Sequence, residues 1–152
     1  MFATLTLCAT ALLLNPEPET ESKTPAVAVK TETNAKKTIE SDLLAIERNI
    51  VKLTNAERTR RGLPALQLDA SLMKTSRAHA SWMASKRRMV HSRMNLGENI
   101  AMGQPTSTAA LHSWMNSSGH RANILNRKYK KIGAAAYRTP SGTIYWCQQF
   151  KF

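Results

Sequence analysis

The chain has 152 residues, 42% of them hydrophobic, which suits one globular domain with an appendage. Its formal charge is +12, and because residues 1–40 hold four Lys against five Glu, residues 41–152 carry +13 and favour anionic partners. Two cysteines, Cys8 and Cys147, exclude a disulfide framework, and the absence of a basic helix with interleaved aromatic residues argues against a specific nucleic-acid partner.

The amino-terminal segments differ in composition from the rest of the chain. Residues 1–14, "MFATLTLCATALLL", are uncharged and largely apolar but too few to span a bilayer as a helix, so they predict a secretory signal or a short membrane anchor. Residues 15–40 contain three Pro, five Thr, five Glu and no aromatic residue, which is typical of a disordered linker. We therefore expect a secreted or extracytoplasmic protein, tethered or free, with its domain at residues 41–152.

Two helices are expected at the start of this domain. Ser41 is a candidate cap for the first, and Gly62 followed by Pro64 ends it. Its apolar residues recur at steps of three and four: Leu43, Ile46, Ile50 and Leu53. Asp69 is the expected cap of the second helix, at residues 70–89. The stripe of that helix is Leu72, Ser76, His79 and Met83.

The remainder predicts further helices and a hairpin. Residues 89–103 are punctuated by Gly97 and Gly103 and are expected to be mostly loop. Thr106 or Ser107 is the candidate cap of a third helix that runs through "TAALHSWM", and a short helix follows in "NSSGHRANILN". Residues 132–138 and 143–150 alternate as two strands joined by a Pro-Gly turn. The sum is an α+β domain with three to four helices and a small antiparallel sheet.

Four histidines and few acids limit the chemistry. His79 lies on an apolar stripe and is most simply a core histidine, and His112 lies within the third helix as a surface or packing residue. His91 and His120 instead fall in polar, turn-rich segments, where binding residues concentrate. With Glu98, the one acidic residue between Ala70 and Phe152, they are the one set that could form a cluster of two His and a carboxylate.

The set of His91, Glu98 and His120 has three open interpretations. It can hold a divalent metal, or the carboxylate can orient one imidazole as a general base. Alternatively, Glu98 can be a structural anchor that accepts hydrogen bonds from loop N–H groups. A serine nucleophile at Ser117 or Ser118 is weakly indicated, because Glu98 is the one acid nearby.

Several stretches together resemble a known family. "VHSRMNLGENIAMG", "ALHSWMNSSGHRANILN", "IGAAAYR" and "GTIYWCQQF" look like the CAP (or SCP) domain of cysteine-rich secretory proteins, antigen 5 and pathogenesis-related proteins class 1, in its short bacterial form. The resemblance covers about residues 43–152. It implies an α-β-α sandwich with a cleft formed by two His and two Glu, which in some members holds a metal.

Three of these four cleft residues match by motif: His91, Glu98 and His120. The second glutamate is expected three residues after Trp114, where this chain has Ser117. The loss of an anionic ligand predicts that zinc, if it binds at His91, His120 and Glu98, binds weakly, with Asn116 or Ser117 as a further oxygen donor. The expected cleft residues are His91, Glu98, Asn99, Asn116, Ser117 and His120.

The resemblance defines the fold better than the activity. We expect a monomeric binding module rather than an enzyme, whose basic domain approaches an anionic envelope or membrane surface and whose cleft takes a lipid-like or cell-envelope ligand. The alternatives are a hydrolase or peptidase that uses His91 or His120 as its base with Glu98 orienting it, and a structural envelope protein in which these residues only hold the loops.

Overall fold

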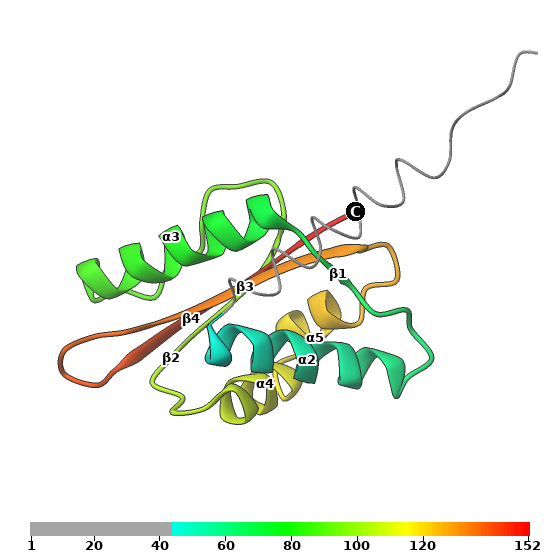
Figure 1. Ribbon diagram of the computed structural model, residues 1–152, viewed down its shortest axis with the longest axis horizontal. Helices are drawn as coiled ribbons and strands as arrows, with labels where there is room; N and C mark the ends of the chain where they lie inside the picture. Colours follow the sequence, from blue (N-terminus) through cyan, green and yellow to red (C-terminus); the bar gives the residue numbers. More distant parts are fainter. Residues whose placement is uncertain (1–43) are drawn as a thin grey trace, which may run out of the picture.

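The computed structural model describes residues 44–152, so the predicted signal segment, the linker and the Ser41 cap lie outside the described residues. The described chain forms three layers (Figure 1). Helix α3 (Ala70–Lys86) covers one face of a four-stranded sheet, and α2 (Ala45–Thr59), α4 (Ser107–Met115) and α5 (Ser118–Ile124) cover the other. The α-β-α sandwich of an α+β domain is thus confirmed.

The sheet is mixed, which corrects the expectation of an antiparallel one. Its order is β1 (Gln67–Leu68), β3 (Lys131–Arg138), β4 (Ile144–Lys151) and β2 (Gly97–Met102). The β3–β4 hairpin and the β4–β2 pair are antiparallel, whereas β1 runs parallel to β3. The two-residue strand β1 lies between α2 and α3 and was too short for any periodicity to reveal it.

Strand β2 also corrects the prediction that residues 89–103 are mostly loop. All six residues from Gly97 to Met102 pair with β4. The outer edge of β2 is closed by side chains, since the Trp114 indole N–H donates to the Ile100 carbonyl at 3.0 Å and the Asn123 amide donates to the Glu98 carbonyl at 3.1 Å. These contacts satisfy edge groups that would otherwise offer a pairing surface.

The helix caps follow the sequence pattern. The Asp69 carboxylate accepts the Leu72 N–H at 2.9 Å at the start of α3, and the Thr106 hydroxyl accepts the Ala109 N–H at 3.1 Å at the start of α4. Helix α2 begins at Ala45, where Glu47 accepts the Leu44 N–H. Helix α3 ends three residues earlier than expected, because Arg87 takes a left-handed conformation with φ of 50°.

The two faces of β4 separate two buried clusters. Ile144, Trp146 and Phe150 pack on the α2 and α4 side, whereas Tyr145 and Cys147 pack beneath α3. Each side also holds one fully buried glutamine. Gln148 donates to the Thr54 hydroxyl at 2.7 Å, and Gln149 accepts from the Thr75 hydroxyl at 2.6 Å. The predicted alternation of β4 is confirmed.

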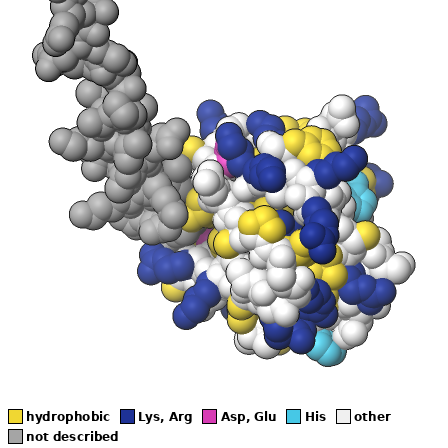
Figure 2. Space-filling view, turned by 90° about the vertical axis from the view of Figure 1, so that its right-hand side faces the viewer, with side chains coloured by type: hydrophobic (Ala, Val, Ile, Leu, Met, Phe, Trp, Pro, Cys, Tyr) yellow, Lys and Arg dark blue, Asp and Glu magenta, His cyan; other side chains and the backbone are white. Residues whose placement is uncertain are grey.

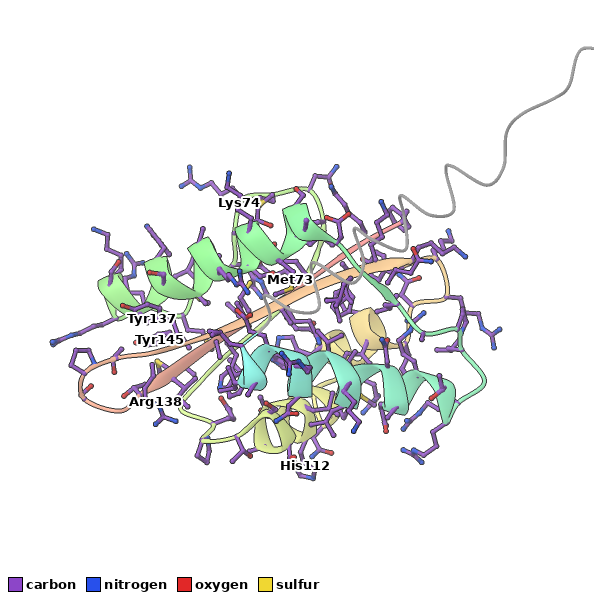
Figure 3. The ribbon with its side chains drawn as sticks, in the orientation of Figure 1. Met73, Lys74, His112, Tyr137, Arg138 and Tyr145 are labelled. Atoms are coloured by element: carbon purple, nitrogen blue, oxygen red, sulfur yellow. The ribbon has the colours of Figure 1, made fainter. Side chains whose placement is uncertain are left out.

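Close helix packing explains Gly133 on β3. A β-carbon at this position would lie 2.2 Å from the backbone carbonyl carbon of Leu72 in α3. Met73 lies between this helix and the sheet (Figure 3), and its sulfur accepts the Ala134 N–H at 3.3 Å. Because the obstructing atoms are backbone, only glycine lets α3 approach β3 this closely.

Arg58, near the carboxyl end of α2, is a basic residue that the fold buries completely. Its guanidinium donates to three backbone carbonyls: Pro64 at 3.0 Å, Ile124 at 2.7 Å and Asn126 at 2.9 Å. Burial lowers the Arg58 pKa from its usual value. Since Ile124 closes α5, Arg58 fixes that helix against α2.

Candidate functional site

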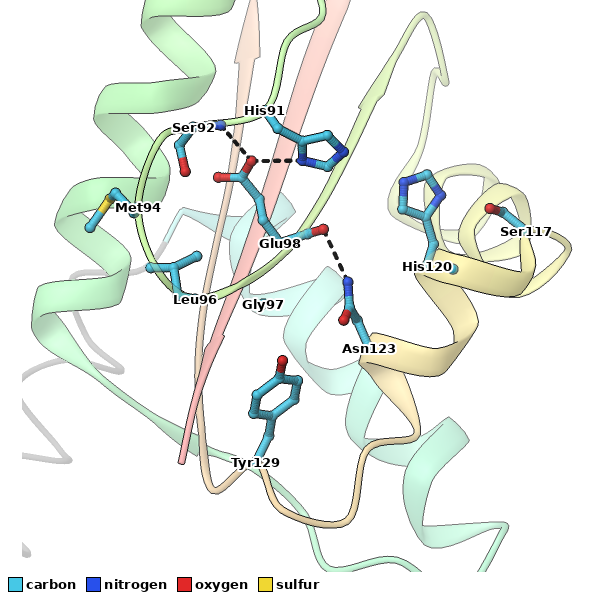
Figure 4. Close-up of a pocket in the computed structure, with 11 residues that line it drawn as sticks. His91, Ser92, Met94, Leu96, Gly97, Glu98, Ser117, His120, Asn123 and Tyr129 are labelled. Carbon is cyan, nitrogen blue, oxygen red and sulfur yellow. Dashed lines mark hydrogen bonds and ion pairs between the residues drawn. The ribbon is translucent and has the colours of Figure 1, made fainter.

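A cleft of about 490 Å³ opens between the start of β2 and helix α5 (Figure 4). The loop before β2 and the first strand residues form one wall, α5 forms the other, and Tyr129 lies at one end. The lining residues are His91, Ser92, Met94, Leu96, Gly97, Glu98, Ser117, Gly119, His120, Asn123 and Tyr129.

Glu98 lies at the base of the cleft with both carboxylate oxygens engaged. Oε1 accepts the Ser92 N–H at 2.8 Å and the His91 Nδ1–H at 2.9 Å. Oε2 accepts the Gln149 amide at 2.9 Å and lies 3.9 Å from the Cys147 sulfur. Only 5% of its side chain is exposed, and this buried carboxylate links the loop before β2 to strand β4 by hydrogen bonds.

The contacts of Glu98 decide its charge state. Burial raises its pKa, but hydrogen bonds from Gln149, Ser92 and His91 outweigh burial, and the pKa of Glu98 lies below its ordinary value. The neighbouring thiol responds in the opposite sense. Burial and the Glu98 charge hold the pKa of Cys147 well above its usual range, so this fully buried sulfur stays a neutral thiol and is no nucleophile.

The Glu98 contact sets the orientation of His91. A carboxylate can only accept, so the Nδ1 atom of His91 carries a hydrogen and its far ring edge faces His120 across the opening (Figure 4). The His91 side chain is 58% exposed, which leaves that edge available to a ligand. The two imidazole centroids are 6.5 Å apart.

His120 is held differently. The Asn99 amide donates to the His120 backbone carbonyl at 3.1 Å and to Gln148 at 3.2 Å, but no hydrogen bond to the His120 imidazole is found within residues 44–152. Burial, and then the neighbouring His91, lower the pKa of His120. Ser117, where the family resemblance implies a second acid, lies beside His120 on the same wall (Figure 4).

The other candidate residues lie outside the cleft opening. Asn99 is fully buried behind it and supports His120. Asn116 is exposed and its amide contacts the His112 ring at 3.1 Å, on the outer side of α4, from which His112 points outward (Figure 3). Asn116 therefore does not line the cleft. His79 on α3 contacts the Val90 carbonyl at 2.9 Å through Nε2, which lies 3.9 Å from Glu98.

Seven of the eleven lining residues were not predicted from the sequence, and Tyr129 and Asn123 are the two with the most specific contacts. The Tyr129 hydroxyl lies so close to Gly97 that a β-carbon there would be 2.4 Å from it, and the Tyr129 ring stacks on Phe150 with centroids 5.4 Å apart. Asn123 bridges the cleft walls, since its amide contacts the Glu98 carbonyl and the Asn99 side chain at 3.0 Å. An available signal was the "GHRANIL" spacing, which places Asn123 one turn after His120.

The residues present do not fit a tight metal site. Glu98 uses both oxygens for hydrogen bonds, so the remaining donors at the opening are two imidazoles and the Ser117 hydroxyl. Across the described range 44–152, no group of three His, Cys, Asp or Glu is placed to hold a metal ion. Zinc in proteins is held by at least three Cys, His or carboxylate ligands, and in this cleft the two imidazoles alone are free to serve as such.

The fold and this cleft agree with a match to a known family. The profile of the Cysteine-rich secretory protein family, CAP, matches residues 51–150. The chain therefore belongs to the CAP family.

Particular relatives support this assignment. The Bacillus subtilis protein YkwD is 40% identical over 148 residues, which cover 86% of this chain and 56% of YkwD. Pathogenesis-related protein 1 of Arabidopsis thaliana is 28% identical, over 66% of this chain and 73% of its own. The B. subtilis membrane protein YlbC is 28% identical and is covered over 34% of its length, so this chain spans about half or less of the two Bacillus relatives.

Solved structures share the fold. An extracellular protein with an SCP domain from Bacillus anthracis superposes with a TM-score of 0.62 at 27% identity, over 70% of this chain and 40% of that one. An outer surface protein of Borrelia burgdorferi superposes with a TM-score of 0.63 at 18% identity, over 68% of this chain and 89% of that one.

Among residues 44–152, no helix is long and apolar enough to cross a membrane.

Proposed function

We propose that this is a secreted or surface-held CAP domain that binds, without catalysis, a cell-envelope ligand carrying a phosphate or carboxylate group. One observation carries the proposal: His91 and His120 face each other across the cleft with centroids 6.5 Å apart, while the carboxylate of Glu98 is withdrawn beneath them. The opening thus presents imidazole and hydroxyl groups, which suit an anion.

The charge of the domain supports an anionic ligand. Residues 41–152 carry +13, and Lys and Arg side chains spread over the face shown in Figure 2, with small apolar patches between them. Such a field raises the local concentration of an anionic ligand and speeds its encounter. Met94 and Leu96 give the cleft an apolar wall, which suits the non-polar part of a lipid-like ligand beside the anionic group.

Glycerol phosphate is the simplest chemistry that meets these requirements, and it occurs both in phospholipid headgroups and in envelope polymers. Calorimetry with sn-glycerol 3-phosphate and with phosphatidylglycerol vesicles separates the two sources. We expect binding that His120→Ala and His91→Ala each weaken at least about tenfold, the equivalent of 1.4 kcal/mol.

His112→Ala is the matched control, because His112 is exposed and lies outside the cleft. It is expected to leave binding unchanged. Absence of binding, or equal weakening by all three histidine variants, would contradict the proposal.

Hydrolysis is the second candidate, because the His91–Glu98 contact of 2.9 Å is the geometry in which a carboxylate orients a general base. Against it, no hydroxyl or thiol is hydrogen-bonded to either cleft imidazole among the described residues, and the Cys147 thiol is buried. Peptide and ester libraries test this candidate: turnover that His91→Ala abolishes would establish an enzyme.

A further inference from the structure

A second hollow of about 500 Å³ lies on the other side of His91. It is formed by α3 and the loop before β2, and its lining residues are His79, Trp82, Arg88, Val90, His91, Ser92 and Arg93. His91 and Ser92 line both this hollow and the cleft. The two hollows are therefore neighbours that share one wall.

The second hollow combines an aromatic surface with cationic groups. The Trp82 indole stacks on His79, with centroids 5.7 Å apart and planes 10° from parallel, and 43% of Trp82 stays exposed. Arg88 and Arg93 are both exposed, and within residues 44–152 neither forms an ion pair. Free guanidinium groups beside an indole suit phosphate or carboxylate groups on a carbon chain.

The hollow is held in shape before any ligand arrives. The contact of 2.9 Å between His79 and the Val90 carbonyl joins the loop to α3, and the Ser92 N–H is held by Glu98. A pre-formed site avoids the entropy cost of ordering a loop on binding. Each hollow alone has a volume within the range of about 300–1,000 Å³ that is typical of small-molecule sites.

We infer that the ligand is an extended anionic chain that crosses His91, with one anionic unit between His91 and His120 and another at Arg88 and Arg93. This inference rests on the proposed function and specifies its substrate class: a polymer with repeating phosphate or carboxylate groups. Occupation of two linked subsites by one chain raises the affinity through effective concentration. A single unit fills only one subsite and gains nothing from the other.

The test compares sn-glycerol 3-phosphate with a soluble oligo(glycerol phosphate) in calorimetry on the full chain. We expect the oligomer to bind at least about tenfold more tightly per phosphate than the monomer. Arg88→Gln with Arg93→Gln should remove this advantage, and the monomer binding that remains should still depend on His120. Trp82→Ala should reduce the advantage in part.

A double variant at Lys74 and Arg138, each changed to Gln, is the matched control. It removes the same charge at two exposed positions, on α3 and at the end of the hairpin (Figure 3). If this control lowers oligomer affinity as much as the Arg88 and Arg93 changes, the effect is diffuse charge and the inference is wrong.

Equal affinity for oligomer and monomer, or preference for phosphatidylglycerol vesicles over the oligomer, would also overturn the inference. Failure of the proposed function looks different, because then neither probe responds to His120→Ala.

Discussion

The two walls of the cleft hold their histidines in different ways. On the strand side, Glu98 joins His91, Ser92 and Gln149, so the position of the imidazole is fixed by a buried carboxylate. On the helix side, the His120 ring has no such partner among the described residues, and only its backbone carbonyl is held, by Asn99.

The family resemblance relates this difference to one position. The family resemblance implies a second acid where this chain has Ser117, and a serine hydroxyl cannot hold an imidazole as a carboxylate does. Burial and His91 lower the pKa of His120, and no carboxylate lines the helix side of the cleft. In the proposed function, the strand side fixes the position of His91, and the helix side provides an imidazole that can take up a proton when an anion binds.

The largest expected loss of stability comes from removing the contacts that hold helix α5 against α2. Arg58→Met removes the hydrogen bonds that Arg58 makes to Pro64, Ile124 and Asn126 and leaves buried carbonyls without donors. We expect a loss of about 3 kcal/mol or more in the free energy of unfolding, measured by urea denaturation. Arg127→Met, at a position nearer the surface, is the control and should change stability by less than about 0.5 kcal/mol. A small effect at Arg58 would show that α5 does not depend on it.

Removing the Glu98 contacts on the strand side should lower the free energy of unfolding by a smaller amount. Glu98→Gln keeps one oxygen but places an amide against groups that donate, so we expect a loss of about 1–3 kcal/mol. Because folding lowers the pKa of Glu98, its stabilising contribution is present above the unfolded value of 4.5 and is lost as pH falls through the folded one. Thermal melts at several pH values measure both effects. Unchanged acid sensitivity in the variant would contradict the role given to Glu98.

Restoring the acid tests the helix side directly. Ser117→Glu places a carboxylate beside His120, which should raise the His120 pKa and weaken binding of glycerol phosphate by about tenfold. It should also increase zinc affinity by about tenfold or more in calorimetry, because it supplies an anionic ligand. Ser118→Glu, one residue further and exposed, is the control. Equal effects of the two variants on glycerol phosphate and zinc binding would mean that position 117 does not interact specifically with His120.

The smallest expected effect is the dependence of stability on His120 protonation. Because the folded pKa of His120 lies below 6.5, the unfolded chain binds the proton more readily, and stability should fall slightly as pH drops through 6.5. Anion binding should reverse this trend and strengthen as the pH falls. Denaturation of wild type beside His120→Gln at about pH 5 to 8 measures it, and identical profiles would argue against a perturbed His120.

Local patterns predicted most of the fold. Asp69 and Thr106 cap their helices as expected, and the alternation of β4 placed Trp146 and Cys147 on opposite faces. Strand β2 was missed because residues 98–101 are buried on both faces, so no alternation marks them, and glycines flank them like a loop. The burial of Arg58 could not be predicted, because it depends on carbonyls from distant segments, which no local pattern reveals.

Motif spacing predicted only part of the site. The spacing related His91, Glu98, Ser117 and His120, and the structure brings these four residues to one cleft. It could not show that Asn116 turns toward His112, since adjacent residues on a helix end face different ways. The second hollow was also out of reach, because it depends on α3 and the loop before β2 packing together.

The most direct test of an anion between the two imidazoles is the titration of His120 itself. NMR of the imidazole nitrogens gives the His120 pKa with and without oligo(glycerol phosphate). An anion bound there stabilises the protonated ring, so the pKa of His120 should rise on binding. Binding of the oligomer with no change in the His120 titration would contradict the account.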